Sequence, residues 1–319
     1  MNPYLALGTS ALSFFLGFAP QRPAIVNPAQ QVMAETAAAE TDAAANSTPV
    51  MVNTLAELGF DPEATESFIP ESLTVSSNPA EGSRAIIGED DRVLLTSQSY
   101  PWSAVGQISG IAPNGNGYIC TGSLVAPDVV LTNAHCVMDS DTGEMARNVK
   151  FKPNLINGRV TDLNDIANVH SVLLGTDFAD GRNPHPDDWA FVALDRPLGQ
   201  KYGTLALAPL PTATLAQAPF LDNLVMVGYS GDFPASNPGQ SASAHIGCSI
   251  VDAWQDVVLH ACDTYGGSSG GPILGLVNDE VRIVALNSAE ATDRDTGEGI
   301  INFAVKIPRI VNQLRAMAN

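Results

Sequence analysis

The sequence predicts an all-β protein with two antiparallel six-stranded barrels and one C-terminal helix. The 319-residue chain carries 27 glycines and 22 prolines, which suits many short strands joined by turns better than a helical bundle. Short apolar runs separated by turn residues recur along residues 103–306, a pattern typical of closed antiparallel barrels. Residues 308–318 follow with apolar side chains at helical spacing, at Ile310, Val311, Leu314 and Met317.

The first 34 residues are predicted to be a signal peptide. Residues 5–19 are apolar but short for a transmembrane helix, and they suit the hydrophobic core of a signal peptide. No Lys or Arg precedes this run, which departs from the usual pattern. Cleavage is expected after Ala34. The protein is therefore expected to be secreted or periplasmic, without stable membrane insertion.

Residues 35–84 are predicted to be a disordered or loosely packed pro-segment, in which residues 51–60 could form a helical turn or two. They are rich in Ala, Glu, Ser, Thr and Pro, and Phe60 and Phe68 are their only aromatic residues. Such a composition buries little apolar surface. Arg84 is the only basic residue between Arg22 and Arg92, so cleavage of a zymogen is expected next to it. The alternative is a linker that is never cut.

Residues 85–319 are predicted to form the folded domain. The first barrel is expected at about residues 95–195 and the second at about 205–306, with residues 196–215 as the connection between them. The expected strands of the first barrel are residues 103–111, 117–124, 129–133, 148–152, 169–174 and 189–194. Those of the second barrel are residues 223–229, 243–251, 256–261, 270–276, 281–287 and 300–306.

The charge of the chain bears on its partners. The formal net charge is −19, which argues against nucleic acid and anionic membranes as binding partners. Residues 139–144 and 293–298 resemble calcium loops superficially, but neither follows the EF-hand spacing, so we expect solvated turns there. No cofactor or metal is expected, and the protein is expected to be a monomer.

Four cysteines indicate an oxidising compartment. If residues 117–136 form a strand, a turn and a second strand, Cys120 and Cys136 meet, which leaves Cys248 to pair with Cys262. Each disulfide would close a short loop, worth about 3 kcal/mol in the chain-entropy model. Reduced cytosolic thiols are the alternative. A zinc site has little support because no Cys-x-x-Cys pair occurs.

Glycines crowd two adjacent serines near the C-terminal third of the chain. Residues 266–272 read Gly-Gly-Ser-Ser-Gly-Gly-Pro. Glycine lets the backbone turn tightly and expose its N–H groups. A serine nucleophile needs this setting, because two backbone N–H groups must already point at the oxyanion that forms when a carbonyl is attacked. By itself, such a run also fits an ordinary loop between strands.

A second stretch, residues 132–136 (Thr-Asn-Ala-His-Cys), makes a family visible. Together with residues 267–272 it resembles the chymotrypsin-fold serine proteases. The chain is most similar to their bacterial glutamyl-endopeptidase-like (V8-like) branch, which has an Asp-Thr pair before the nucleophile, as at residues 263–264. An entry segment like residues 90–104 is also typical of that branch. The resemblance covers about residues 86–312.

The resemblance implies a catalytic triad. His135 would be the general base, and Ser269 would be the nucleophile in the frame Gly-x-Ser-Gly-Gly-Pro. Asp188 would orient the imidazole, because it precedes a hydrophobic strand as the family's aspartate does, while its neighbour Asp187 is expected to be solvated. The backbone N–H groups of Gly267 and Ser269 would form the oxyanion hole.

Chain order argues against another serine hydrolase fold. Residues 267–271 also match Gly-x-Ser-x-Gly, the nucleophile elbow of α/β-hydrolases. Those enzymes need a histidine after the serine, and none follows Ser269. The remaining histidines are expected to be structural or surface residues: His170, His185, His245 and His260.

The substrate pocket leaves two alternatives open. In the V8-like branch, glutamate preference goes with a threonine matched here by Thr264 and a histidine replaced here by Asn287, which is followed by Ser288. Asp263 stands where a trypsin-like pocket has its acidic floor, which would favour a basic P1 residue. Both acidic and basic P1 preferences therefore remain.

The resemblance implies a serine endopeptidase that acts on polypeptides through an acyl-enzyme. Ser268 replaces the aspartate that precedes the nucleophile in the animal trypsin-like branch, so activation by an ion pair at that position is not expected. The alternative from another functional class is a catalytically silent, protease-like binding protein. The intact His135, Asp188 and Ser269 argue against it.

Overall fold

The computed structural model describes residues 47–61, 66–75, 90–175, 178, 183–292 and 299–318. The expected signal peptide, the expected cleavage next to Arg84 and the turn at residues 293–298 lie outside these residues. Among the helices that the structure describes, none has the length and apolar character needed to cross a membrane.

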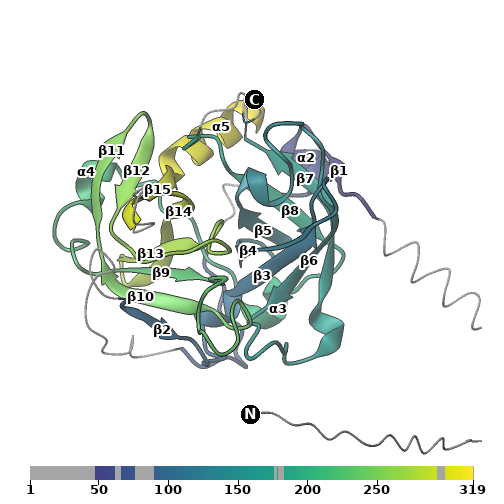
Figure 1. Ribbon diagram of the computed structural model, residues 1–319, viewed down its shortest axis with the longest axis horizontal. Coiled ribbons are helices and arrows are strands. Elements are labelled where there is room, and N and C mark those ends of the chain that lie inside the picture. The colour runs from purple at the N-terminus through teal and green to yellow at the C-terminus, as the bar shows by residue number, and fades with distance from the viewer. Residues whose placement is uncertain are drawn as a thin grey trace, which may run out of the picture. The chain divides into compact units, whose positions relative to one another are not determined.

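The first sheet closes into a barrel. Its strands are β1 (Val50–Met51), β3 (Val105–Ile111), β4 (Gly117–Leu124), β5 (Val129–Thr132), β6 (Arg147–Pro153), β7 (Ala167–Leu174) and β8 (Ala190–Leu194). The order is β1-β7-β6-β3-β4-β5-β8, and β7 also pairs with β8, so β3 to β8 form a closed six-stranded barrel. These strands lie together in Figure 1, in blue to teal.

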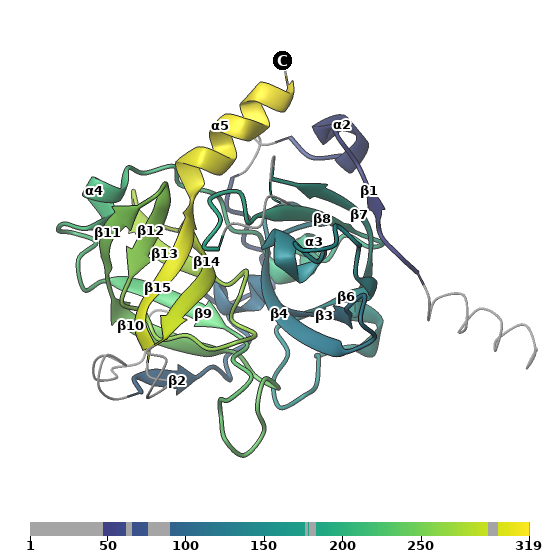
Figure 2. The ribbon, with the colours of Figure 1, turned by 45° about the horizontal axis from the view of Figure 1, so that its top comes forward.

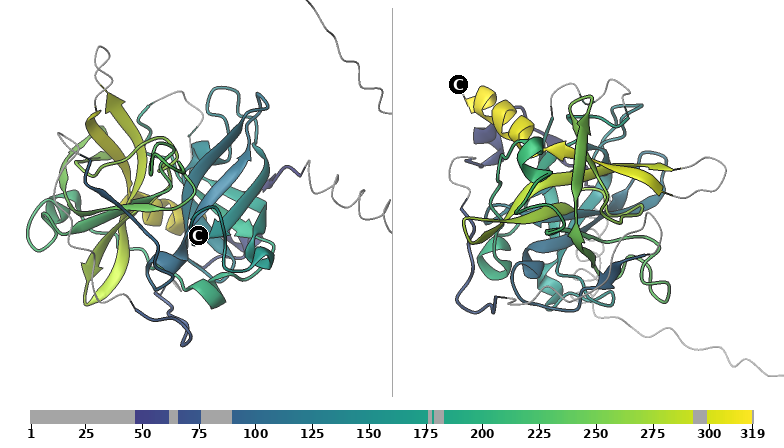
Figure 3. Two further views of the ribbon diagram at one scale, coloured as in Figure 1. Left: turned by 60° about the horizontal axis from the view of Figure 1, so that its bottom comes forward. Right: turned by 90° about the vertical axis from the view of Figure 1, so that its left-hand side faces the viewer.

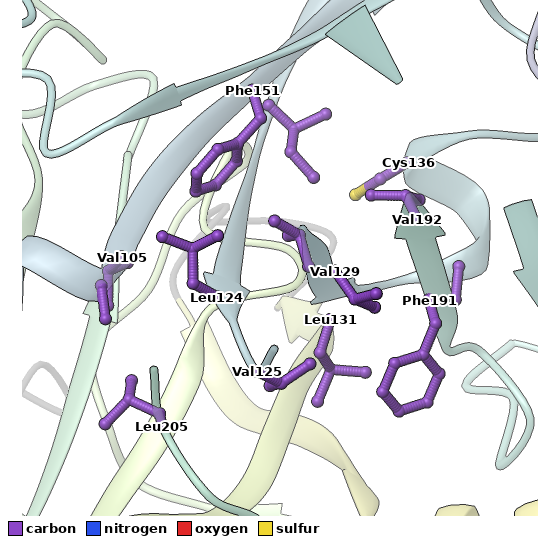
Figure 4. Close-up of a cluster of buried hydrophobic side chains, with 14 of the residues drawn as sticks. Val105, Leu124, Val125, Val129, Leu131, Cys136, Phe151, Phe191, Val192 and Leu205 are labelled. Carbon is purple, nitrogen blue, oxygen red and sulfur yellow. The ribbon is translucent and has the colours of Figure 1, made fainter. Parts of the chain in front are cut away.

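The core of this barrel explains why these runs form strands. Figure 4 shows the apolar side chains of neighbouring strands converging in its interior. Leu131, Phe151 and Phe191 are completely buried. Full burial of such a side chain contributes about 1.5–3 kcal/mol relative to exposure. The alternation of inward and outward residues in β6 follows the two-residue period of a strand.

The second sheet contains the remaining strands. They are β2 (Arg92–Leu94), β9 (Leu224–Gly228), β10 (Ser243–Cys248), β11 (Ile250–Trp254), β12 (Val257–His260), β13 (Pro272–Val277), β14 (Glu280–Thr292) and β15 (Gly299–Lys306). Their order is β11-β12-β15-β14-β13-β9-β10-β2. The views in Figure 3 show this sheet beside the first barrel, with β2 in blue and its other strands in green to yellow.

A few helices complete the fold. The one-turn helices α3 (Gly199–Tyr202) and α4 (Thr212–Leu215) lie in the connection between the sheets, and α5 (Ile307–Ala318) follows β15. Figure 2 shows α5 in yellow, leaving the end of β15. The predicted fold class, all-β with a C-terminal helix, is confirmed.

Both expected cystine pairs are present. Cys120 is joined to Cys136 and Cys248 to Cys262, with Cα–Cα distances of 6.1 and 4.9 Å. The first disulfide connects β4 to the short helical turn that follows β5, so it fixes the segment that carries His135.

The prediction of disorder between residues 35 and 84 is wrong for the parts that the structure describes. Strand β1 pairs in parallel with β7, and α2 (Leu55–Leu58) begins with a capping box in which Thr54 and Glu57 bond each other's backbone. Leu55 and Leu58 are buried, and Phe60 stacks on Phe191 with ring centroids 4.8 Å apart. These three apolar side chains reach the core, whereas Val50 and Met51 of β1 are exposed.

Further elements differ from the predictions. The predicted strand at residues 243–251 forms two strands, β10 and β11, and the second sheet has eight strands instead of six. The short strand β2 pairs with β10, a contact that its three residues do not reveal in the sequence. Strand β14 runs on to Thr292, beyond the expected end at residue 287, because it pairs with β15 along this extension.

Replacing Leu58 by alanine tests whether the segment at residues 47–61 belongs to the folded domain. Because Leu58 is only 5% exposed, we expect the variant to lose about 2–5 kcal/mol of unfolding free energy. Leu163→Ala is the matched control, since Leu163 is 78% exposed and should change stability by less than about 0.5 kcal/mol. Equal unfolding curves in urea for the two variants would contradict this assignment.

Candidate active site

The candidate site lies where the two sheets meet. His135 and Asp188 belong to the first barrel, and Ser269 belongs to the loop before β13. Thr121 of β4 joins them: its N–H donates to the carbonyl of Ser269 at 2.8 Å, and its hydroxyl donates to the carbonyl of Gly267 at 2.9 Å. The serine loop is therefore held directly against the barrel that carries the histidine.

Strand pairing brings His135 and Asp188 together. His135 follows the end of β5, and Asp188 precedes the start of β8. These strands are antiparallel neighbours, with Thr132 opposite Ala190. The end of one strand therefore meets the beginning of the other, and the two side chains are placed side by side by the sheet itself.

The contact between these residues is bidentate. The backbone N–H of His135 donates to one carboxylate oxygen of Asp188 at 3.0 Å, and Nδ1 of its ring lies 2.7 Å from the other. The Ser288 hydroxyl donates to that second oxygen at 2.7 Å. The Asp188 backbone is held as well, because its carbonyl accepts a hydrogen bond from the Asn133 side chain at 2.6 Å.

The electrostatics of the pair favour its charged form. Burial opposes ionisation of Asp188, but the nearby His135 and hydrogen bonds from His135 and Ser288 hold the pKa of the Asp188 carboxyl below its ordinary value. Burial likewise opposes protonation of His135, yet the Asp188 carboxylate raises the pKa of the imidazole above 6.5. The carboxylate is thus an acceptor that stabilises an imidazolium beside it.

Ser269 shares a cavity with His135. The two line a cavity of about 280 Å³, together with the Cys120 side of the disulfide and Gly267. The Ser269 hydroxyl donates to the Ser288 carbonyl at 3.4 Å, and no hydrogen bond among the described residues joins it to Nε2 of His135. Such contacts are often absent or long before substrate binds, and a rotation about one side-chain bond redirects the hydroxyl.

Three backbone N–H groups of the serine loop have no backbone acceptor among the described residues, and two of them are the predicted oxyanion donors. The N–H groups of Ser268, Gly270 and Gly271 each donate to a backbone carbonyl. Within the described part of the chain, those of Gly267 and Ser269 have no such acceptor, and neither has that of Gly266. The predicted oxyanion donors are thus left unbonded.

Gly267 has to be glycine. Its φ is +103°, and an added Cβ would lie 2.4 Å from the Tyr229 carbonyl oxygen. The sharp turn that results allows its own carbonyl to accept from Thr121 while its N–H stays unbonded.

Asn287 is engaged with its neighbours rather than open to a substrate. It is buried, its amide nitrogen donates to the Ser268 carbonyl at 3.0 Å, and its amide oxygen lies 3.1 Å from Nε2 of His260. The N–H of Cys262 donates to Nδ1 of His260. Burial lowers the pKa of His260 to about 4, so this histidine is neutral and donates through Nε2.

Asp263 is also committed to internal contacts. Its side chain is only 2% exposed, and one carboxylate oxygen accepts the N–H of Asp91 at 2.9 Å and lies 3.2 Å from Nδ1 of His245. The N–H of Asp263 in turn donates to that Nδ1 at 2.9 Å. This carboxylate ties the chain entering β2 to the second sheet.

The other predicted residues are placed as follows. Thr264 is half-buried beside Asp263, and Ser288 bonds Asp188, a role that the sequence did not reveal. His185 is buried, and its Nδ1 accepts the N–H of Asp187 at 2.9 Å. His170 is exposed. Neither of these two histidines is among the described residues that line the cavity of His135 and Ser269.

The expected solvation of Asp187 is wrong. Its side chain is 1% exposed, and Arg309 of α5 pairs with both of its carboxylate oxygens. A buried carboxylate needs such a partner, and the partner lies 122 residues away in the sequence. Arg309 was therefore missed, although its place next to the apolar stripe of α5 marks it as a residue at the helix–barrel boundary.

Within the part of the chain that the structure describes, two groups of side chains have the residue types of a metal site. One contains Cys120, His135 and Cys136, but its sulfur atoms are joined in a disulfide and are not thiolates. The other contains Asp91, His245 and Asp263. Its histidine Nδ1 and one oxygen of Asp263 already accept backbone N–H groups, so the geometry favours a structural role.

Comparison with known proteins finds similarity to peptidases. The family model of the trypsin-like peptidase domain matches residues 120–286. A glutamyl endopeptidase of Bacillus licheniformis is 25% identical over 191 residues, which is 60% of this chain and 54% of the relative. The chain thus spans about half the length of that relative.

Solved structures share the fold. The structure of a Glu endopeptidase superposes with a TM-score of 0.56 at 21% identity, covering 73% of this chain and all of the other. The protease Anisep from Arthrobacter nicotinovorans gives a TM-score of 0.54 at 19% identity, covering 72% of this chain and all of the other.

Proposed function

Because the chain belongs to the trypsin-like peptidase family, we propose that it is a serine endopeptidase that hydrolyses polypeptides through an acyl-enzyme on Ser269. One observation carries this proposal. His135 is bound to Asp188 through both its backbone and its ring, and it lines one cavity together with Ser269. That arrangement supplies a base, a group that orients the base, and a nucleophile.

The first half of the reaction forms the acyl-enzyme. The Ser269 oxygen attacks the carbonyl carbon of the scissile peptide bond while its proton passes to Nε2 of His135. Asp188 stabilises the imidazolium, and the oxyanion lies against the N–H groups of Gly267 and Ser269. His135 then gives its proton to the leaving amine as the C–N bond breaks.

The second half releases the product. Water attacks the acyl carbonyl, again losing a proton to His135, and the bond to the Ser269 oxygen breaks as that oxygen takes the proton back. No metal is needed in either half, because the charge of the oxyanion is met by backbone donors. The two disulfides support export into an oxidising compartment, where such an enzyme would act on polypeptides outside the cytosol.

We infer that neither Asp263 nor Asn287 reads the charge of the P1 residue. Asp263 is bound by Asp91 and His245, and the Asn287 amide is bound by His260 and Ser268. A substrate side chain would have to break these buried contacts to reach either group, at a cost of about 1–3 kcal/mol for each polar group left unpaired. This argues against strong selection for arginine, lysine or glutamate through these two residues.

Replacing Ser269 by alanine tests the nucleophile. We expect kcat/KM for peptide cleavage to fall by at least about 10⁴-fold, because no covalent intermediate can form. Ser268→Ala is the matched control, since the Ser268 hydroxyl bonds Ser230 rather than lining the cavity of His135.

A fluorophosphonate probe gives the second readout for the same variants. It should label the wild-type chain and Ser268→Ala but not Ser269→Ala. If the wild-type protein is folded and disulfide-bonded yet neither cleaves a peptide library nor takes the label, the protein is a binding protein and the proposed activity is wrong.

The pH dependence tests the pairing of His135 with Asp188. The base must be neutral to accept a proton, and its pKa is raised above 6.5 by Asp188. The value of kcat/KM should therefore be low in acid and rise with pH, with a midpoint above 6.5. A midpoint at or below 6.5, with the protein folded throughout, would refute the pairing.

Profiling cleavage sites tests the inference about P1. The wild-type chain and Asp263→Asn should share one P1 profile in a peptide library, because the carboxylate is buried and committed to internal contacts. Asp263→Asn should instead lower thermal stability, since the carboxylate accepts the Asp91 N–H and lies 3.2 Å from Nδ1 of His245. Loss of cleavage after Arg or Lys in this variant alone would show that Asp263 is the pocket floor after all.

A further inference from the structure

We propose that Arg309 and Gln313 of α5 are positioning residues for Asp188, acting through its two neighbours in the chain. This inference rests on the proposed function and names a part of the enzyme far from the substrate. The helix α5 is the last element of the chain, and neither Arg309 nor Gln313 lines the cavity of His135 and Ser269.

Asp187, the residue before Asp188, forms an ion pair with Arg309. The Arg309 guanidinium donates to both carboxylate oxygens of Asp187, from Nε at 2.6 Å and from Nη2 at 2.7 Å. Gln313 adds a third donor, its amide nitrogen, at 2.6 Å. Because the Asp187 side chain is 1% exposed, its charge depends on these partners.

Trp189, the residue after Asp188, is bound by Gln313. The indole nitrogen of Trp189, a fully buried side chain, donates to the amide oxygen of Gln313 at 2.8 Å. Gln313 therefore binds the residue before Asp188 and the residue after it. With both neighbours turned toward α5, the Asp188 side chain is directed the opposite way, toward His135.

A further arm of Arg309 reaches the second sheet. Its Nη1 donates to Asp256, which lies in the turn between β11 and β12. Lys306, at the end of β15, pairs with the other oxygen of Asp256 at 3.0 Å. Arg309 thus joins the loop that carries Asp188 to the second sheet, whose strands β12 and β13 flank the Ser269 loop.

The position of α5 agrees with this role. Ile310 and Leu314 bury the apolar stripe of the helix, while Arg309 and Gln313, four residues apart, share a neighbouring face. Figure 1 shows α5 leaving β15 and crossing toward α2 and the first barrel. The buried apolar stripe packs the helix, and the polar pair makes the contacts to Asp187 and Trp189.

The consequence concerns the pairing of Asp188 with His135. We call the contacts of Arg309 and Gln313 with Asp187 and Trp189 the clamp. If the clamp is removed, Asp188 is held less firmly against the imidazole, and the imidazolium is stabilised less. The rate of the chemical step should then fall while substrate binding changes little. The pKa of His135 should fall as well, because its raised value comes from Asp188.

The test compares Arg309→Met with Lys306→Met. Both variants remove a cation that pairs with Asp256, but only Arg309 touches Asp187. We expect Arg309→Met to lower kcat at least tenfold, to change KM less than threefold, and to move the midpoint of kcat/KM to lower pH. Lys306→Met should keep the wild-type kcat and midpoint. Arg309→Lys should restore part of kcat, since it keeps the charge without the two-point contact.

A second variant covers the case in which Arg309→Met does not fold. Gln313→Leu keeps the ion pair and removes the link from Asp187 to Trp189, so kcat should fall about threefold with the same shift in midpoint. The inference is overturned if a folded Arg309 variant matches Lys306→Met in kcat and midpoint. It is also overturned if Gln313→Leu matches the wild-type chain in both.

A readout without turnover separates this inference from the proposed function. The pKa of the His135 imidazole can be measured by NMR titration in the wild-type chain and in the variants. A lower pKa of His135 in Arg309→Met than in Lys306→Met supports the clamp even if the wild-type chain cleaves nothing. In that case only the proposed activity is contradicted. Equal pKa values in a chain that does cleave peptides would overturn the clamp alone.

Discussion

The site depends on the buried carboxylate of Asp188. Taking a carboxylate out of water is costly unless its oxygens are hydrogen-bonded, and here His135 donates from two atoms and Ser288 from a third. The same contacts that make the buried charge tolerable also orient the imidazole. Stability and chemistry therefore rest on one group, and the elements around it serve to keep it in place.

The two sheets contribute to this arrangement in different ways. The first barrel sets the distance between His135 and Asp188 through the pairing of β5 with β8. The second presents Ser269 and the unbonded N–H groups, and Thr121 fastens that loop to the first barrel. Ser288 connects the two, since its hydroxyl bonds Asp188 and its carbonyl accepts from Ser269.

The strands could be predicted from local patterns in the sequence. Features that depend on contacts between distant residues could not. Strand β4 has the bounds predicted from its turn and apolar residues, and the motif around His135 marks its position. In contrast, the sequence selects Asp188 as the partner of His135 but leaves Asp187 as a solvated neighbour, because the partner that buries Asp187, Arg309, lies 122 residues away. The packing of the α2 segment against the barrel escaped prediction for the same reason, because Phe60 stacks on the distant Phe191.

The most direct test of the account is the tautomer of neutral His135, measured by ¹⁵N NMR of the imidazole above its pKa. If Asp188 holds the ring as the 2.7 Å contact indicates, the proton resides on Nδ1, and Nε2 is bare and able to accept the proton of Ser269. A proton found on Nε2 would mean that the ring cannot act as the base, and the account of the site would be wrong.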